Sequence, residues 1–149
     1  MVTVFYADTS AVVRAFMPDE PDHAQLVELL LDNDELVVTS ELTRVEFASA
    51  MATARNNGRI RHAAPALARF DEETRGAGAL SLIPLVPRVI MPAAYRLVSD
   101  HHTLRTLDAI HLAVALHGTA ELTGGEPVAM VTRDQRQADA AKAHGLEVR

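Results

Sequence analysis

Short apolar runs alternate with longer stretches in which apolar residues recur every three or four positions. The short runs predict strands at residues 2–7, 35–39, 79–83, 127–132 and 146–148. The longer stretches predict helices at residues 10–17, 22–32, 41–56, 61–75, 87–99, 104–117 and 135–144. Pro92 lies inside one of these helices and is expected to kink or restart it.

Helices separate the predicted strands almost everywhere along the chain. Strands joined through helices pair in parallel, which predicts an α/β fold: an α/β/α sandwich around a central parallel sheet. A run such as residues 2–7, apolar at nearly every position, is typical of a strand buried on both faces. No repeat or low-complexity linker interrupts the pattern, so we expect one domain over residues 1–149. Residues 117–127 are expected to form a turn or loop.

The composition excludes several kinds of chemistry. The 149 residues are 48% hydrophobic and 23% charged, as in an ordinary globular protein. They include no cysteine, which excludes disulfides, thiolate zinc sites and a cysteine nucleophile. Lys142 is the single lysine, so mechanisms that need a catalytic lysine are nearly closed off. A net charge of −6 argues against a generally basic surface that coats nucleic acid, but it permits a local basic patch.

Neither a targeting segment nor a membrane span is apparent. The N-terminal apolar run lacks a basic start and soon meets Asp8, unlike a signal peptide. The most apolar stretch, residues 77–95, is interrupted by three prolines and an arginine and is unsuited to a bilayer. We therefore expect a cytoplasmic protein without membrane contact.

Four acids stand near strand ends or helix starts. Asp8 and Asp134 follow predicted strands, whereas Glu46 and Asp108 lie within apolar helices. The carboxyl ends of parallel strands share one edge of the sheet, where ligands bind. The fold could therefore gather all four acids at that edge, and a cluster of carboxylates suits Mg²⁺ or Mn²⁺.

Each acid also has a purely structural explanation. Asp8 and Asp134 precede helices and could cap them. Thr43 and Glu46 have the spacing of a capping box, and Asp108 could be a favourable acid in the first turn of its helix. Two ionised carboxylates about 5 Å apart repel by roughly 3 kcal/mol at an effective dielectric near 20. Four of them together would need protons or cations.

Several basic residues are candidates for contact with phosphate groups. Arg55, Arg59 and Arg61 surround a predicted turn, where they form either a solvated helix end or a phosphate-binding patch. Arg105 precedes one of the acids by three residues and could pair with it or touch phosphate. His111 lies on the same helix face, and we expect it to be a buried, hydrogen-bonded residue rather than a ligand.

Four segments together resemble the PIN-domain ribonucleases in order and spacing. They read F-Y-A-D-T-S-A-V-V-R, T-S-E-L-T-R-V-E-F, R-T-L-D-A-I-H-L-A-V-A-L and V-T-R-D-Q-R-Q-A-D-A-A-K-A-H-G-L-E-V. The chain is most similar to the toxins of bacterial VapBC toxin–antitoxin pairs, and the resemblance covers nearly all of it. Position by position, Asp8, Glu46, Asp108 and Asp134 match the acidic quartet of that family. Ser10 matches the hydroxyl beside the first acid.

The resemblance implies a PIN-like fold with about five parallel strands and a magnesium-dependent endoribonuclease, with manganese as an alternative ion. Asp8, Asp108 and Asp134 would hold the ion, and Glu46 would complete the site directly or through water. The resemblance also implies an RNA substrate, inhibition by a small antitoxin protein and a homodimer. One alternative is a non-catalytic PIN-like module that binds RNA or protein. A receiver or phosphatase-type phosphotransfer domain is less favoured, because Ser10 stands where the phosphatase needs a second acid.

Overall fold

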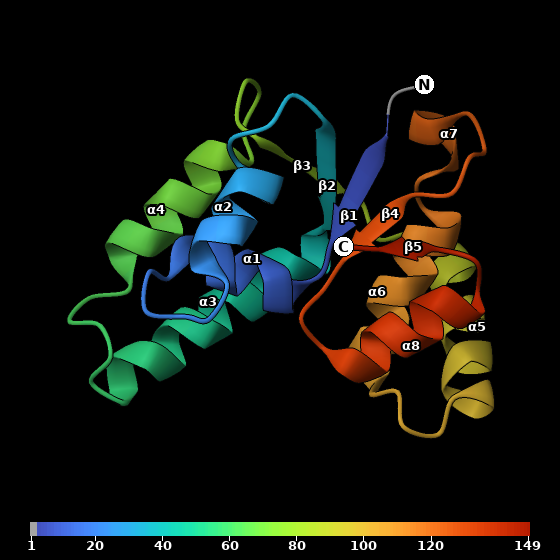
Figure 1. The fold of residues 1–149 in the computed structure, drawn as a ribbon. Coiled ribbons are helices and arrows are strands. Elements are labelled where there is room, and N and C mark those ends of the chain that lie inside the picture. The colour runs from blue at the N-terminus through green and yellow to red at the C-terminus, as the bar shows by residue number, and fades with distance from the viewer. Residues whose placement is uncertain (1–2) are drawn as a thin grey trace.

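A parallel sheet of five strands runs through the middle of the molecule in the computed structural model, which describes residues 3–149 (Figure 1). All strand pairs are parallel, in the order β3-β2-β1-β4-β5. The strands are β1 (Val4–Ala7), β2 (Leu36–Ser40), β3 (Leu80–Ile83), β4 (Ala129–Val131) and β5 (Glu147–Val148). The predicted parallel sheet is thereby confirmed, although Val2 of the first predicted strand lies outside the described residues.

Helices connect the strands at the positions that the apolar periodicity predicts, within a few residues. They are α1 (Thr9–Phe16), α2 (His23–Leu30), α3 (Glu41–Asn56), α4 (Ala64–Glu73), α5 (Pro87–Asp100), α6 (Thr106–His117), α7 (Ala120–Thr123) and α8 (Gln135–Ala143). The short α7 corrects the expectation of a plain turn or loop at residues 117–127. Four residues are too few to show a helical period, and Gly124 ends the helix in the left-handed conformation, with φ of 64°.

The sequence predicts that Pro92 kinks or restarts its helix, and of these two outcomes the structure excludes the restart. Helix α5 continues through this residue to Asp100. A proline within a helix leaves the carbonyl four residues earlier without its usual N–H partner. Because Pro92 and Arg88 both lie on the exposed face of α5, water can satisfy that carbonyl.

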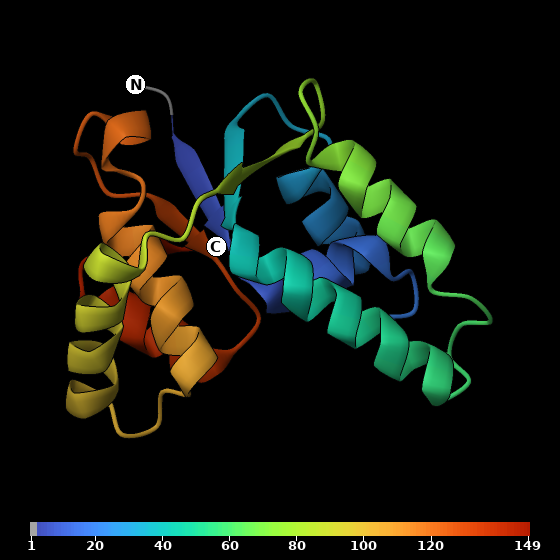
Figure 2. The same cartoon turned by 180° about the vertical axis from the view of Figure 1, so that it is seen from behind.

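The side chains of the central strand alternate between two hydrophobic cores. Val4 and Tyr6 of β1 belong to the core under α5, α6 and α8, whereas Phe5 and Ala7 belong to the core under α1–α4. The two groups of helices cover opposite faces of the sheet (Figures 1 and 2). This alternation explains why β1 is apolar at every position and buried throughout.

The chain order reverses between β1 and β4, and this reversal locates the candidate site. From β1 the chain builds outward through β2 and β3, and it then returns to place β4 on the other side of β1. Ligands of open parallel sheets bind at such a switch point, beyond the carboxyl ends of the strands. Asp8 follows β1 here, and its backbone N–H donates to the Val131 carbonyl at the end of β4, at 3.2 Å.

Three phenylalanines hold α1, α3 and α4 together, and Phe47 is the central one. Its ring stacks on Phe70 with centroids 4.7 Å apart and meets the edge of Phe16 at 5.3 Å. We expect Phe47→Ala to lower the free energy of unfolding by about 3–5 kcal/mol, the usual cost of such a cavity. Val45→Ala on the same helix, where the side chain is 68% exposed, should change it by less than about 0.5 kcal/mol. Urea denaturation of both variants measures the difference, and equal losses would contradict this account.

Candidate active site

Asp8 is buried, and donors on three sides fix its carboxylate. Its Oδ1 accepts from the Ser10 hydroxyl at 2.6 Å and from the backbone N–H of Ala11 at 3.1 Å. Its Oδ2 accepts from the Thr132 hydroxyl at 2.5 Å. Burial raises the pKa of Asp8, and the hydrogen bonds from Ser10, Thr132 and Ala11 oppose that rise without cancelling it. Asp8 therefore caps α1, as the structural explanation predicted, and it also occupies the edge where a ligand would bind.

Two hydroxyl groups link the ends of β1 and β4. Besides donating to Asp8, Ser10 accepts from the backbone N–H of Arg133 at 2.9 Å. Thr132 accepts in turn from the backbone N–H of Asp134 at 3.1 Å. The sequence analysis identified Ser10 but missed Thr132. Its position directly after β4, matching that of Asp8 after β1, is the feature that could have revealed it.

Asp134 caps α8, which confirms its structural explanation. Its Oδ1 accepts from the backbone N–H groups of Arg136 at 2.9 Å and Gln137 at 3.3 Å. The Arg136 guanidinium lies 3.7 Å from the same oxygen, on a side chain that is partly exposed. The cap holds this carboxylate at the same sheet edge as Asp8.

Glu46 lies in the second turn of α3 and reaches toward α1 and α6. Its Oε1 accepts from the Thr9 hydroxyl at 2.7 Å and from Nε2 of His111 at 2.5 Å. Burial alone would raise the pKa of Glu46, but the hydrogen bonds and the charge interaction with His111, together with Thr9, lower it overall. Glu46 is therefore held in its ionised form. The sequence analysis missed Thr9, although it stands directly beside Asp8.

The capping-box explanation of Glu46 is wrong. Helix α3 begins at Glu41, and the Ser40 hydroxyl caps it by accepting from the N–H of Leu42 at 3.0 Å. Thr43 therefore lies inside the helix, where its buried hydroxyl lies 2.6 Å from that of Thr39. The Glu46 carboxylate therefore has no capping role at the start of α3.

Asp108 shows that the four acids share one electrostatic environment. It lies in the first turn of α6, as the structural explanation anticipated. Its pKa is raised to about 6, first by partial burial, then by repulsion from Asp134 and Asp8 and by a smaller contribution from Glu46. His111 opposes the rise. Acids up to 100 positions away in sequence therefore act on Asp108 at the carboxyl edge of the sheet.

The donor set fits a hard cation chemically, but it does not converge on one point. Within residues 3–149, no three acidic or histidine side chains are close enough to form a ready metal-binding group. Hydrogen bonds direct Asp8, Glu46 and Asp134 toward their own neighbours instead. The oxygens of carboxylates and hydroxyls are nevertheless the ligands that Mg²⁺ and Mn²⁺ prefer.

His111 is buried and hydrogen-bonded, as expected. It is 1% exposed, and its Nδ1 lies 2.8 Å from the hydroxyl of Tyr6. The sequence analysis missed Tyr6 because a tyrosine in an apolar strand looks like any other core residue.

The predicted arginines occupy different surroundings. Arg59 contacts Asp19 and Glu20, each at 2.9 Å, and these ion pairs join the turn after α3 to the one after α1. Arg55 and Arg61 are exposed. Arg105 is exposed as well, and it makes no ion pair with the four acids in the described part of the chain. Asp19 and Glu20 thus already largely neutralise Arg59.

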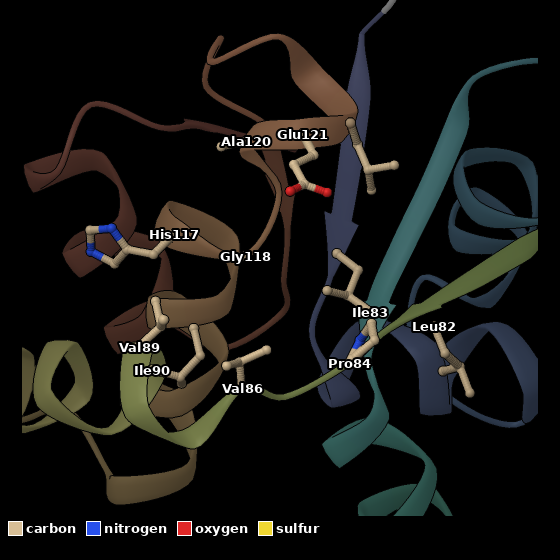
Figure 3. Close-up of a pocket in the computed structure, with 11 residues that line it drawn as sticks. Leu82, Ile83, Pro84, Val86, Val89, Ile90, His117, Gly118, Ala120 and Glu121 are labelled. Atoms are coloured by element: carbon tan, nitrogen blue, oxygen red, sulfur yellow. The ribbon is translucent and has the colours of Figure 1, made fainter.

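Two grooves lie near these elements. One of about 450 Å³ begins at Thr9 and Glu46, follows the polar face of α3 past Thr53, and includes Arg59 and Leu107. A second, of about 520 Å³, is lined mainly by apolar side chains of β3, α5 and α7, with Glu121 pointing into it (Figure 3). Only the first groove is continuous with one of the four acids.

Comparison with known proteins agrees with this geometry. The sequence model of the PIN domain matches residues 5–143. Among solved structures, VapBC2 from Rickettsia felis bound to a promoter DNA fragment is similar at 12% identity, covering 99% of this chain and 98% of that one, with a TM-score of 0.65. VapC20 from Mycobacterium tuberculosis, a toxin that cleaves the sarcin-ricin loop, is similar at 18% identity, covering 97% and 98%, with a TM-score of 0.64.

A toxin–antitoxin complex from Klebsiella pneumoniae is also similar, at 19% identity over 91% of this chain and 88% of that one, with a TM-score of 0.51. A search of curated protein sequences gave no match. At these identities the solved structures support the fold alone.

The raised pKa of Asp108 predicts how stability depends on pH. Between its ordinary value of 3.8 and about 6, the folded protein binds more protons than the unfolded chain. Asp108 therefore lowers stability progressively as pH rises through this range, and the cost persists at pH 7. We expect Asp108→Asn to melt above the parent at pH 7 in chelator, and the gain should disappear below about pH 4.

Glu121→Gln is the matched control, since this exposed acid also lies in the first turn of a helix. It should not raise the melting temperature. If Asp108 acts only through the helix dipole, Asp108→Asn should instead lower stability by about 0.3–1 kcal/mol. Thermal melts at pH 4 and pH 7 separate the two outcomes.

Proposed function

Because the chain belongs to the PIN domain family, we propose that it is a metal-dependent endoribonuclease that cleaves phosphodiester bonds in RNA. The observation that carries the proposal is the electrostatic coupling of four acids at the switch point of the sheet, expressed in the pKa of Asp108. Such a concentration of negative charge favours a divalent cation. We further propose that residues 1–149 act as one nuclease domain in the cytoplasm. No helix among residues 3–149 has the length and apolar character needed to cross a membrane.

The proposed ligands are Asp8, Asp108 and Asp134, with Glu46 completing the site directly or through water. When bound, Mg²⁺ or Mn²⁺ stabilises charge on the scissile phosphate and makes a bound water more acidic. Ser10 keeps the Asp8 carboxylate oriented. Asp108 is the acid whose charge state a cation would change most, since repulsion already raises its pKa.

The protein partner that we propose is a small antitoxin. Solved structures similar to this chain in fold include a toxin–antitoxin complex, and this supports the assignment. An arginine of such a partner, placed among the acids, would suit them, because a guanidinium can bind two carboxylates at once. Its positive charge would substitute for the cation and block the site.

A homodimer is also part of the proposal. The outer side of α5 exposes Val89 and Tyr95, Val86 lies just before this helix, and Leu122 lies in nearby α7. The side chains of Val86 and Val89 border the apolar groove in Figure 3, and Leu122 also lines this groove. Self-association through this face would remove them from water.

Cleavage should depend on a divalent cation. Purified protein is expected to cut RNA with Mg²⁺ or Mn²⁺ and to stop in excess EDTA, because carboxylates alone do not activate water for phosphodiester hydrolysis. Asp108→Asn should abolish the cleavage while the protein remains folded. Mg²⁺ should also raise the melting temperature of the parent more than that of this variant. Undiminished cleavage in chelator would exclude the mechanism.

Binding of RNA phosphates by the exposed arginines should appear in the salt dependence of affinity. Removing one cation that neutralises a phosphate of single-stranded RNA reduces the slope of log K against log salt by about 0.7. We expect that reduction for Arg55→Ala and again for Arg61→Ala. Arg59→Ala should change the slope less, because Asp19 and Glu20 already neutralise this guanidinium. Fluorescence anisotropy at several salt concentrations gives the slopes. Unchanged slopes would show that the turn is a solvated helix end and does not bind RNA phosphates.

A further inference from the structure

A tyrosine and a histidine meet inside the protein, directly behind the candidate site. Tyr6 lies in the central strand β1 and is fully buried, and His111 in α6 is 1% exposed. The Tyr6 hydroxyl lies 2.8 Å from Nδ1 of His111. Burial and the nearby Asp8 raise the pKa of Tyr6 above its ordinary value, so its hydroxyl keeps the proton and can donate it in a hydrogen bond.

The other ring nitrogen of His111 points to the site. Nε2 lies 2.5 Å from Oε1 of Glu46 and 3.1 Å from the Thr9 hydroxyl. An ionised carboxylate only accepts hydrogen bonds, so Nε2 carries the proton that faces Glu46. On the other side of the ring, Nδ1 faces the Tyr6 hydroxyl, a group that can both donate and accept a hydrogen bond.

These contacts connect three layers of the fold. Tyr6 belongs to the sheet, His111 to a helix on one face, and Glu46 to a helix that covers the other face. Glu46 contributes to the repulsion on Asp108, so its carboxylate needs a donor to hold it at the shared edge. His111 supplies that donor, and Tyr6 fixes the ring that carries it.

We propose that Tyr6 and His111 form a buried hydrogen-bond chain that positions the Glu46 carboxylate for cation binding at the active site. Both are positioning residues, because they act through Glu46 and do not touch the substrate. The inference rests on the proposed nuclease function for its activity readout and on the proposed cation site for its Mg²⁺ readout. A group that orients a carboxylate from behind typically contributes about 10- to 100-fold to metal affinity or activity.

Two amide variants separate positioning from simple packing. In His111→Gln the longer side chain can place its amide N–H where Nε2 was, and so it can still donate to Glu46. In His111→Asn the shorter side chain reaches only the place of Nδ1, where it can accept from Tyr6 but not reach Glu46. Both variants remove the ring and should lower stability by similar amounts.

We expect His111→Asn to reduce kcat by about 10- to 100-fold with little change in KM. It should also weaken the rise in melting temperature that Mg²⁺ produces. His111→Gln should recover most of both, and Tyr6→Phe should fall between them because the ring remains but loses its fixed orientation. Thr119→Val is the control: its buried hydroxyl donates to the Ala115 carbonyl of α6, and it lies eight residues after His111 in the sequence. It should change stability without changing kcat or the Mg²⁺ response.

The outcomes distinguish this inference from the function itself. If the Asn and Gln variants lose activity and Mg²⁺ response equally, the chain is a packing feature and the proposal is wrong. If the parent cleaves no RNA, the nuclease function fails. The ordering of the Mg²⁺-induced shifts among the variants then still decides whether Tyr6 and His111 position Glu46.

Discussion

Repulsion among carboxylates at the end of the sheet is the constraint on which the rest of this structure depends. Parallel topology brings Asp8 and Asp134 to one edge, and α3 and α6 add Glu46 and Asp108. At three of the four positions, nearby hydrogen-bond donors partly compensate the negative charge. Hydroxyls and a backbone amide surround Asp8, and backbone amides donate to Asp134. Thr9 and His111 donate to Glu46. The Asp108 side chain makes no hydrogen bond or ion pair within residues 3–149, and partial burial and repulsion from the other acids raise its pKa to about 6.

Capping and the proposed cation binding are compatible roles for the same side chain. Asp8 and Asp134 are both true N-caps, so the structural explanation of each was correct. The amides at a helix start orient the carboxylate and partly compensate its charge, which is also what a closely packed group of acids requires. A helix that begins at the carboxyl edge of a parallel sheet therefore offers a favourable place for a negatively charged site. Reasoning from sequence could not choose between the two roles, because the same residue type serves both.

Local sequence patterns predicted the helices and strands well, but they could not predict side-chain contacts between residues far apart in the sequence. The limits predicted for α3 match because Ser40 caps its start and Asn57-Gly58 ends it, features that the sequence displays. The short α7 was missed because four residues carry no period. The contacts of Thr132 with Asp8 and of His111 with Tyr6 join residues 124 and 105 positions apart, and only the strand order determines them. Glu46 was given a competing role because Thr43 imitated a cap that Ser40 in fact provides.

The position of Asp108 shows how the fold can favour cation binding over its own stability. A carboxylate that already had donors would gain little from a cation, since the ion would replace existing hydrogen bonds. Asp108 instead carries unrelieved repulsion in the folded protein, and a bound cation would remove that cost in addition to forming its own contacts. The repulsion lowers the free energy of unfolding of the cation-free protein. Binding of the ion to the folded state raises it again, because such binding shifts the folding equilibrium. A fourth well-satisfied acid would give a more stable protein with a weaker site, and this opposition between stability and function is common where charge must be concentrated.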